Sequence, residues 1–391
     1  MKEWKEVTLS EICTDISYGY TESASLLPIG PKFLRITDIV PPAIDWGRVP
    51  YCKISNGNYQ KYKLEIGDIV IARTGATTGF NKTIKEQVDS VFASYLIRYK
   101  IDKAVADPFY IGYCLQSNSW YEYVDAIAGG SAQPGANAKQ LGSFEISLPP
   151  LPEQRAIASI LSSLDDKIDL LHRQNATLEA MAEALFRQWF VVEAREEWEE
   201  ISLLDAIELV GGGTPKTSMP KYWDGNICWL SGGDIASNHK NFVLTSEKTI
   251  TELGLENSSA KLLPKYSTII SARGTVGKYC LLATPMTFSQ SNYGIKPRYR
   301  DCYFFTYLLV AYCVEELQAA AYGSVFDTIT TNTFKEHKIY LPKEDVILSF
   351  EEEVRSLFLK MLSNQTQIRT LTALRDTLLP KLMSGELRVK M

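Results

Sequence analysis

The chain lacks the residue patterns that hold most metal centres and disulfide frameworks. Its 391 residues include seven cysteines, an odd number at irregular spacing, and three histidines that lie far apart. No two cysteines form a CxxC pair and no HExxH occurs, so the ligand spacings of common zinc sites are missing. We therefore expect neither a structural metal nor a disulfide framework.

Long apolar runs and an excess of positive charge are also missing. No run approaches the ~18 apolar residues of a membrane-spanning helix, and the start MKEWKEV is not the apolar core of a signal peptide. We expect a cytoplasmic protein with no membrane partner. The net charge of −5 argues weakly against a nucleic-acid binder, because such domains are usually basic. A local basic face can still coexist with an acidic remainder.

Several common catalytic motifs are missing from the chain. It contains no Asn/Asp-Pro-Pro-Tyr motif for amino methylation and no Walker-type GxxxxGK[ST]. The run Gly211-Gly212-Gly213 lacks the GxGxxG pattern, and Glu336-His337-Lys338 matches only half of a nuclease site. We expect no catalytic residue, and no metal or cofactor bound by this chain.

An internal repeat is the main positive feature. Ile146-Ser147-Leu148-Pro149 matches Ile339-Tyr340-Leu341-Pro342 at a shift of 193 residues. Near the start, WKEVTL resembles WEEISL, and IARTGATTG further on resembles SARGTVG, both at nearly the same shift. A nearly constant shift over this length predicts a tandem of two similar halves.

Each half predicts the same order of elements. A body of short apolar runs, turn residues and some helical stretches is followed by a long helix. The expected fold is α+β, with two similar α/β bodies separated by two long helices. The expected boundaries are 1–152 for the first body, 153–195 for the first long helix, 196–345 for the second body and 346–391 for the second long helix.

Both long helices carry a heptad repeat. Apolar positions alternate in steps of four and three, from Ile157 to Trp189 and from Phe350 to Leu382. Neither helix can bury such a seam alone, so we expect the two to pair as a coiled coil. Two ordinary core helices with tolerated polar residues are the alternative.

Two asparagines among these apolar positions discriminate between parallel and antiparallel pairing of the long helices. A parallel pair would bury Asn175 without a partner, whereas one antiparallel register sets Asn175 opposite Asn364 and Leu171 opposite Ile368. We expect the amide pair to fix register and orientation, the best-attested use of a buried polar pair. The two bodies would then be related by a pseudo-two-fold axis and offer two similar surfaces to a partner.

The chain resembles the specificity subunit of a Type I restriction–modification system. LPPLPEQRAIASILSSLDDKIDLL, followed by LEAMAEALFRQWF, is similar to the central conserved region of that family, and TLLPKLMSGELRV to its distal counterpart. GGGTPKTSMPKYWDGNICWLSGGDI resembles the opening of many of its target recognition domains. The first half departs from this opening, because no TP…YW follows Tyr18-Gly19-Tyr20.

The resemblance implies that each body reads one half of a bipartite site in double-stranded DNA and that the helices are the spacer. It implies two methyltransferase subunits, which carry S-adenosylmethionine and methylate adenine, and a restriction subunit that uses ATP with Mg²⁺. The specificity subunit itself is non-catalytic. A fused or Type IIB-like system would differ only in its partners. The rival reading is an adaptor that bridges two proteins without reading DNA, which the acidic balance favours.

DNA recognition needs cations for phosphates and planar polar side chains for base edges. Three segments offer them: the loop Arg73–Gly79 with its counterpart Arg273–Lys278, the segment Ser131–Lys139 with its counterpart Ser324–Lys335, and Gln290–Tyr293. For each, a tight turn with solvated polar groups is the alternative. The predicted DNA contacts are Arg73, Thr74, Thr77, Lys82, Gln133, Asn137, Lys139, Lys216, Arg273, Thr275, Lys278, Gln290, Asn292, Ser324, Thr331, Asn332 and Lys335.

Overall fold

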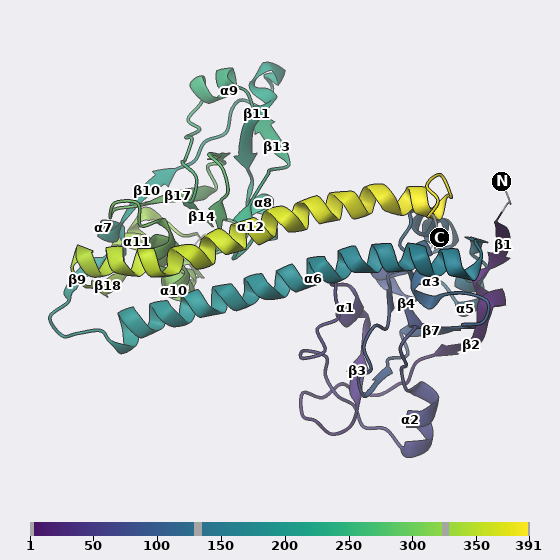
Figure 1. Ribbon diagram of the computed structural model, residues 1–391. Helices are drawn as coiled ribbons and strands as arrows, with labels where there is room; N and C mark the ends of the chain where they lie inside the picture. Colours follow the sequence, from purple (N-terminus) through teal and green to yellow (C-terminus); the bar gives the residue numbers. More distant parts are fainter. Residues whose placement is uncertain (1–3, 129–134, 323–327, 390–391) are drawn as a thin grey trace. The chain divides into compact units, whose positions relative to one another are not determined.

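The chain folds into two compact units, each built from one body and a part of each long helix (Figure 1). This computed structural model describes residues 4–128, 135–322 and 328–389. Unit 1 runs to Asp169 and resumes at Thr370, and unit 2 is Leu170–Arg369. The long helices are α6 (Leu151–Arg187), which continues as a π-helical turn over Gln188–Val192, and α12 (Glu344–Met383).

The body of unit 1 is an antiparallel sheet in the order β2-β7-β4-β5, covered by helices. A smaller parallel pair, β3 and β6, packs on this sheet through Leu34 and Phe92, and β1 pairs with β8 where the body begins and ends. The strands are β1 (Lys5–Thr8), β2 (Cys13–Tyr18), β3 (Lys32–Leu34), β4 (Asp68–Ala72), β5 (Asn81–Thr83), β6 (Ser90–Phe92), β7 (Leu96–Ile101) and β8 (Glu145–Leu148). The helices are α1 (Ile36–Ile39), α2 (Asn56–Tyr62), α3 (Pro108–Cys114), α4 (Asn118–Ala128) and α5 (Ala138–Gly142).

Unit 2 repeats this plan. Its sheet has the order β10-β17-β14-β15-β12, a second sheet has the order β13-β11-β16, and β9 pairs with β18. The strands are β9 (Glu199–Ser202), β10 (Ile207–Gly211), β11 (Trp223–Leu230), β12 (Phe242–Val243), β13 (Lys248–Ile250), β14 (Thr268–Ser271), β15 (Tyr279–Leu282), β16 (Thr287–Phe288), β17 (Asn292–Pro297) and β18 (Lys338–Leu341). The helices are α7 (Leu203–Ala206), α8 (Gly232–Ser237), α9 (Glu252–Glu256), α10 (Tyr303–Tyr322) and α11 (Thr331–Glu336).

The predicted α+β class and the duplication are therefore confirmed. The pairing of β2, β7, β4 and β5 in unit 1 has its equivalent in β10, β17, β14 and β15 of unit 2. One visible difference is the long helix α10, whose place in unit 1 is taken by α3 and α4. The Ser-Asn-Ser sequence from Ser117 accounts for that break, because these side chains compete for backbone hydrogen bonds inside a helix.

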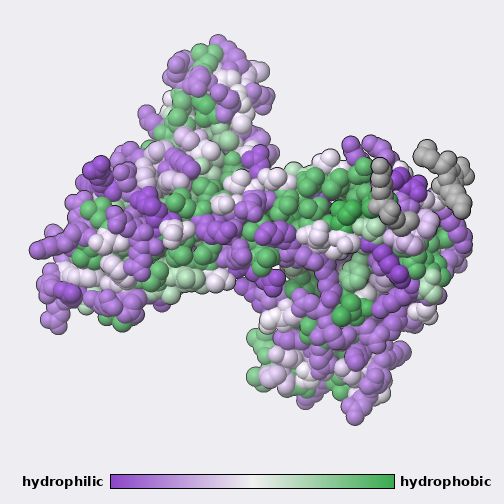
Figure 2. Space-filling view, in the orientation of Figure 1, coloured by the Kyte–Doolittle hydropathy of each residue, from purple (hydrophilic) through white to green (hydrophobic). Residues whose placement is uncertain are grey.

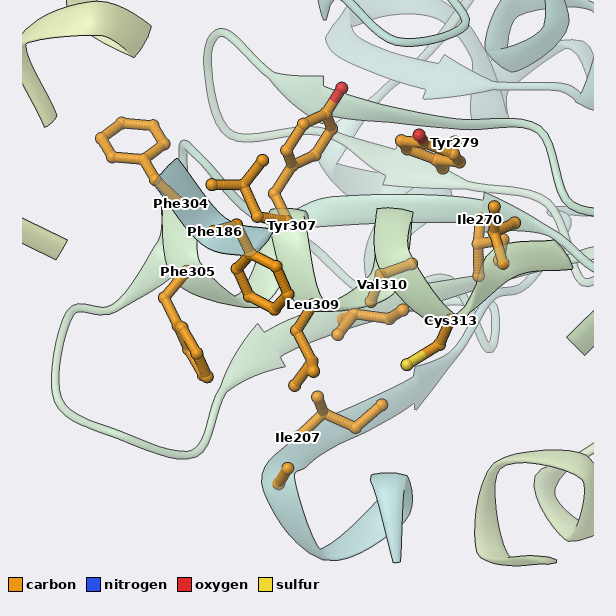
Figure 3. Packing of buried hydrophobic residues seen from close by; sticks show 14 of the residues in the cluster. Phe186, Ile207, Ile270, Tyr279, Phe304, Phe305, Tyr307, Leu309, Val310 and Cys313 are labelled. Atoms are coloured by element: carbon orange, nitrogen blue, oxygen red, sulfur yellow. The ribbon is translucent and has the colours of Figure 1, made fainter. Parts of the chain in front are cut away.

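Helix α10 is the centre of the unit 2 core (Figure 3). Its first two turns are wholly buried, from Phe304 to Val310, whereas its C-terminal half has an exposed face that includes Tyr312 and Glu316. The ring of Phe304 stacks on Phe358 of α12 at a centroid distance of 4.6 Å, and Phe305 lies 6.0 Å from Phe186 of α6. The body of unit 2 is thus packed directly onto its own parts of both long helices. Over the described ranges, the chain offers no helix whose length and apolar content would suit a lipid bilayer.

Within unit 2 the two long helices run antiparallel. Asn364 Nδ2 donates to Asn175 Oδ1 at 2.9 Å, and Asn175 Nδ2 donates to the carbonyl of Met361 at 3.3 Å. Further along, the ring of Trp189 lies 5.6 Å from that of Phe350. Both asparagines are buried, so the predicted contact is present between two amides that are shielded from water.

Within unit 1 the two long helices are also antiparallel, and charged residues take the place of the amides. Arg375 occupies a heptad position on α12, and its Nη1 lies 3.0 Å from Asp165 Oδ1 on α6. Beyond the end of α12, Arg388 binds both carboxylate oxygens of the buried Glu153, at 2.6 and 2.9 Å. The guanidinium of Arg388 also lies over the ring of Trp4, so the last described residues cover the start of unit 1.

We predict that the asparagine pair contributes to stability only as a pair. Asn175→Leu leaves the buried amide of Asn364 with only its longer 3.4 Å contact to Gln174 Oε1, and should lower the free energy of unfolding by about 1–3 kcal/mol. Asn175→Leu with Asn364→Leu should recover most of that loss, because both polar groups are then removed. Urea unfolding of the three chains measures the effect.

Cysteine substitutions test the register itself. Cysteines at positions 175 and 364 should form a disulfide under mild oxidation, because the two side chains face each other. If Asn175→Cys instead cross-links only with Leu357→Cys or Leu371→Cys, one heptad away in either direction, the amide pair does not set the register.

A buried carboxylate makes the stability of unit 2 depend on pH. Glu351 is 2% exposed and accepts hydrogen bonds from the backbone N–H groups of Phe304 and Phe305 at the start of α10. Burial raises the pKa of Glu351 to about 7. A raised folded-state pKa means that the stabilisation is complete below the unfolded value of about 4.3 and is lost as pH rises through about 7.

We therefore expect the wild-type chain to lose stability relative to Glu351→Gln as pH rises from about 5 to about 8. The loss should be up to about 3 kcal/mol, since one pKa unit corresponds to about 1.4 kcal/mol. Urea unfolding of both chains at several pH values measures it. Glu352→Gln, a change at the exposed neighbour, is the control, and an equal trend there would contradict the assignment to Glu351.

Candidate nucleic-acid interface

One edge of the unit 1 sheet gathers the predicted contact loops. Because the strands are antiparallel, β2 ends at Tyr18, β4 ends at Ala72 and β7 begins at Leu96 along the same edge. The loop Arg73–Gly79 leaves the sheet there. The carbonyl of Arg73 accepts a hydrogen bond from Ala136 N at 3.0 Å, so the first two predicted segments lie side by side.

The side chain of Arg73 is held in place on this edge. Its Nε donates to the carbonyl of Ser94 at 3.1 Å, and its guanidinium carbon lies 5.1 Å from the centre of the Tyr18 ring. Tyr18 is itself anchored, because its hydroxyl accepts a hydrogen bond from Ala138 N at 3.1 Å. A cation over a tyrosine face at this distance is an attractive contact.

The sequence reasoning missed two tyrosines of this surface. Tyr18 is 43% exposed and Tyr95 is 59% exposed, although both belong to an ordered sheet edge. Aromatic side chains of this exposure next to an arginine are typical of nucleic-acid surfaces, where bases stack on them. Nothing in the sequence around either tyrosine signals this exposure.

Two glycines fix the shape of the loop that follows Arg73. Gly75 and Gly79 have φ values of +78° and +89°, a region that side chains with Cβ disfavour. The carbonyl of Gly79 accepts a hydrogen bond from the indole of the buried Trp120 at 2.9 Å. Thr78 Oγ1 donates back to the carbonyl of Gly75 at 2.7 Å. The loop is therefore a rigid platform attached to the core.

The equivalent edge of unit 2 corrects the predicted match between the two loops. Arg73 N donates to Tyr95 O and Arg73 O accepts from Ala136 N, whereas in unit 2 the same two bonds are made by Ala272, with Ser291 and Ile329. Ala272 is therefore the equivalent of Arg73, and Arg273 lies one residue further along. The sequence comparison paired Arg273 with Arg73 because both are arginines, but the two residues occupy different backbone positions.

Asn292 is a second correction. It is 1% exposed, and its Nδ2 donates to Ser289 Oγ at 2.8 Å, so it cannot reach a base edge. It supports the turn from within, at the first position of β17. Its neighbour Gln290 is exposed, and the side-chain oxygen of Gln290 contacts the hydroxyl of Thr214.

Lys82 does not join Arg73. Its Nζ donates to the carbonyl of Pro42 at 2.8 Å, inside a groove of about 330 Å³ that is also lined by Asp165 and Arg375. Burial lowers the pKa of Lys82, and the nearby carboxylates of Asp165 and Asp169 oppose this effect. The predicted phosphate contact is wrong for this residue, because its side chain faces α6 within unit 1.

Asn137 has a structural role that the sequence reasoning did not assign. Its side-chain oxygen accepts a hydrogen bond from Gln140 N at 2.9 Å and so caps the start of α5. In unit 2 the equivalent cap at α11 is Thr330, whose hydroxyl accepts from Thr333 N. The cap orients α5 so that Lys139 lies exposed in its first turn.

The other predicted contacts lie in accessible places or outside the described residues. Thr275 Oγ1 donates to Ser271 Oγ at 3.0 Å or to Gly232 O at 3.4 Å, while Thr74, Thr77 and Lys278 are half-buried. Gln133 and Ser324 lie outside the described residues. Within those residues, no group of three or more His, Cys, Asp or Glu side chains is placed to hold a metal ion. Exposed are Lys139, Lys216, Arg273, Thr275, Thr331, Asn332 and Lys335.

Comparison with known proteins identifies the family. The family described as "Type I restriction modification DNA specificity domain" matches residues 1–180 and 195–371. The chain belongs to this family. The match covers both bodies and most of both long helices, and the specificity-subunit resemblance drawn from the sequence is therefore confirmed.

Relatives in the specificity family cover the chain over most of its length. The Type I restriction enzyme MjaIX specificity subunit of Methanocaldococcus jannaschii is 28% identical in an alignment 353 positions long, which covers 83% of this chain and 76% of the relative. The HindI specificity subunit of Haemophilus influenzae is 23% identical and covers 99% of this chain and 100% of the relative. The crystal structure of the S subunit from M. genitalium has the same fold, with a TM-score of 0.66 at 16% identity over 99% of this chain and 96% of that one.

The two glycines of the unit 1 loop give a prediction for this specificity domain. Gly75→Ala should cost about 1–2 kcal/mol of unfolding free energy, the strain of a left-handed conformation, because open space surrounds the position. Gly79→Ala should cost clearly more, because an added Cβ would also lie 2.9 Å from the side chain of Val124. Urea unfolding compares the two, and equal costs would contradict the described packing.

Proposed function

We propose that this chain is the non-catalytic specificity subunit that reads a bipartite site in double-stranded DNA. Each body would read one half-site, and the paired long helices would set the spacing between the two. The observation that supports this most is the repeated loop edge. The same backbone hydrogen bonds position residue 73 in unit 1 and residue 272 in unit 2.

Different side chains on this shared backbone support two different half-sites. Unit 1 has Tyr18 and Arg73 at positions where the strand pairing of unit 2 places Gly211 and Ala272. A protein that joins two partners by a common surface would gain nothing from such a difference. A reader of an asymmetric split sequence requires it, because sequence is read by side chains on base edges.

Matching exposed apolar residues support two copies of one partner. Met181 on α6 is 47% exposed and Leu374 on α12 is 45% exposed, and the two stand 193 residues apart, the shift of the internal repeat. Figure 2 shows hydrophobic residues gathered along the C-terminal part of α12. Exposed apolar patches of this kind mark interaction surfaces.

The partners would then supply the chemistry. We propose that one methyltransferase subunit docks on each repeat and binds S-adenosylmethionine, and that a restriction subunit with ATP and Mg²⁺ joins the assembly. Methylation of adenine requires the target base to leave the helix and enter the pocket of the partner. The role of this chain is to hold the DNA so that this base is presented.

Methylome sequencing of cells that express the chain with its cognate methyltransferase tests the proposal. We expect a split motif with a methylated adenine on each strand. Cells that express the methyltransferase alone are the control and should lack the motif. A continuous methylated site would argue against two bodies that each read one half-site. If the complex assembles but the DNA stays unmethylated, the chain is better explained as an adaptor that bridges two proteins, in keeping with the net charge of −5.

A further inference from the structure

We propose that Arg73 reads a guanine in the half-site recognised by unit 1. The inference rests on the proposed function and deepens it, because it assigns a base to a named side chain. Three features carry it: the way the guanidinium is held, the hydrogen-bond donors that remain free, and the absence of an equivalent residue in unit 2.

The guanidinium is oriented before any DNA is present. Its Nε donates to the carbonyl of Ser94, and its guanidinium carbon lies over the ring of Tyr18. The Tyr18 hydroxyl is fixed in turn by Ala138 N. Arginine side chains lose considerable rotamer entropy on binding, and a side chain that is already held loses less.

The two terminal nitrogens of Arg73 remain available. Within the described part of the chain, neither Nη1 nor Nη2 has a hydrogen-bond acceptor, and no carboxylate pairs with the side chain. They present parallel N–H donors from a fixed fork. In the major groove, guanine offers the two matching acceptors, O6 and N7, whereas adenine presents a donor at N6 in place of O6.

A phosphate contact fits this geometry less well. Phosphates are bound from many directions by a positive charge, and a flexible lysine serves that purpose. In Arg73, by contrast, the hydrogen bond of Nε to Ser94 fixes the direction in which Nη1 and Nη2 point. The exposed lysine of the neighbouring segment, Lys139, is free to provide the charge for the phosphate backbone.

Unit 2 presents no guanidinium at this position. Ala272 takes the place of Arg73, and Gly211 takes the place of Tyr18. Arg273 is exposed one residue further along, and among the described residues neither a ring nor a carbonyl holds its side chain. The guanine assignment is therefore specific to unit 1.

Motif sequencing of variants in the full complex with the cognate methyltransferase tests the assignment. Arg73→Ala should relax one guanine position in one half-site, lowering discrimination there on the order of tenfold or more, while the other half-site stays unchanged. Arg73→Lys should fail to restore the guanine preference, because an ammonium group cannot form the bidentate pair.

Lys139→Ala is the control on the same surface. It should lower methylation at all sites together and flatten the salt dependence of binding, with the motif unchanged. If Arg73→Ala has this same uniform effect and Arg73→Lys repairs it, Arg73 contacts a phosphate and the proposal is overturned. An unchanged motif in both Arg73 variants overturns it as well.

Modified DNA gives a second measurement that does not depend on the folding of any variant. Replacing guanine with 7-deazaguanine removes the N7 acceptor, and the unaltered complex should methylate such a duplex about tenfold more slowly at the Arg73 position. Insensitivity at every guanine of that half-site would overturn the assignment while leaving the split motif intact. Failure to find any split motif would instead contradict the proposed function.

Discussion

Each long helix carries an apolar seam that its own turns cannot cover, and everything else in the protein depends on how that seam is buried. In unit 2 the seam is shared between α6, α12 and the apolar helix α10, so the body and the helices have one common core. In unit 1 the core likewise joins Leu161 of α6 and Leu382 of α12 to the body. The sheet edge that carries the loop after β4 or β14 is thus continuous, through packing, with the helices.

Within these seams the polar positions are as informative as the apolar ones. A buried amide or carboxylate without a partner costs free energy, so each restricts the arrangements that the chain can adopt. In unit 2 Asn364 donates to Asn175, and in unit 1 Arg375 pairs with the partly buried Asp165; within each unit the two helices are antiparallel.

These needs also explain what could be predicted from the sequence. The heptads, the repeat and the asparagine contact follow from periodicity and from the demand that a buried amide be paired. Arg273 was matched to Arg73 because a sequence comparison pairs residues of the same type. The backbone hydrogen bonds, which the sequence does not show, make Ala272 the equivalent residue. Asn292 and Lys82 were misjudged because the direction in which a strand residue points depends on packing that a single sequence does not display.

Tyr18 shows the opposite error, a surface residue that the sequence analysis did not identify. Nothing local distinguishes it from the many tyrosines of the chain, and its significance arises only where the ends of three strands meet. Net charge was equally uninformative, because a few oriented cations on a sheet edge leave the total of −5 almost unchanged. A site of this kind is defined by neighbours that are distant in sequence.

The strand pairs β1–β8 and β9–β18 determine how each body is joined to the rest of the chain. In each body the first and last strands lie side by side, so the chain enters and leaves at a single point. A body attached at a single point can be exchanged as one piece. Under the proposed function, replacing one such body with another would change one half-site while leaving the paired long helices unaltered.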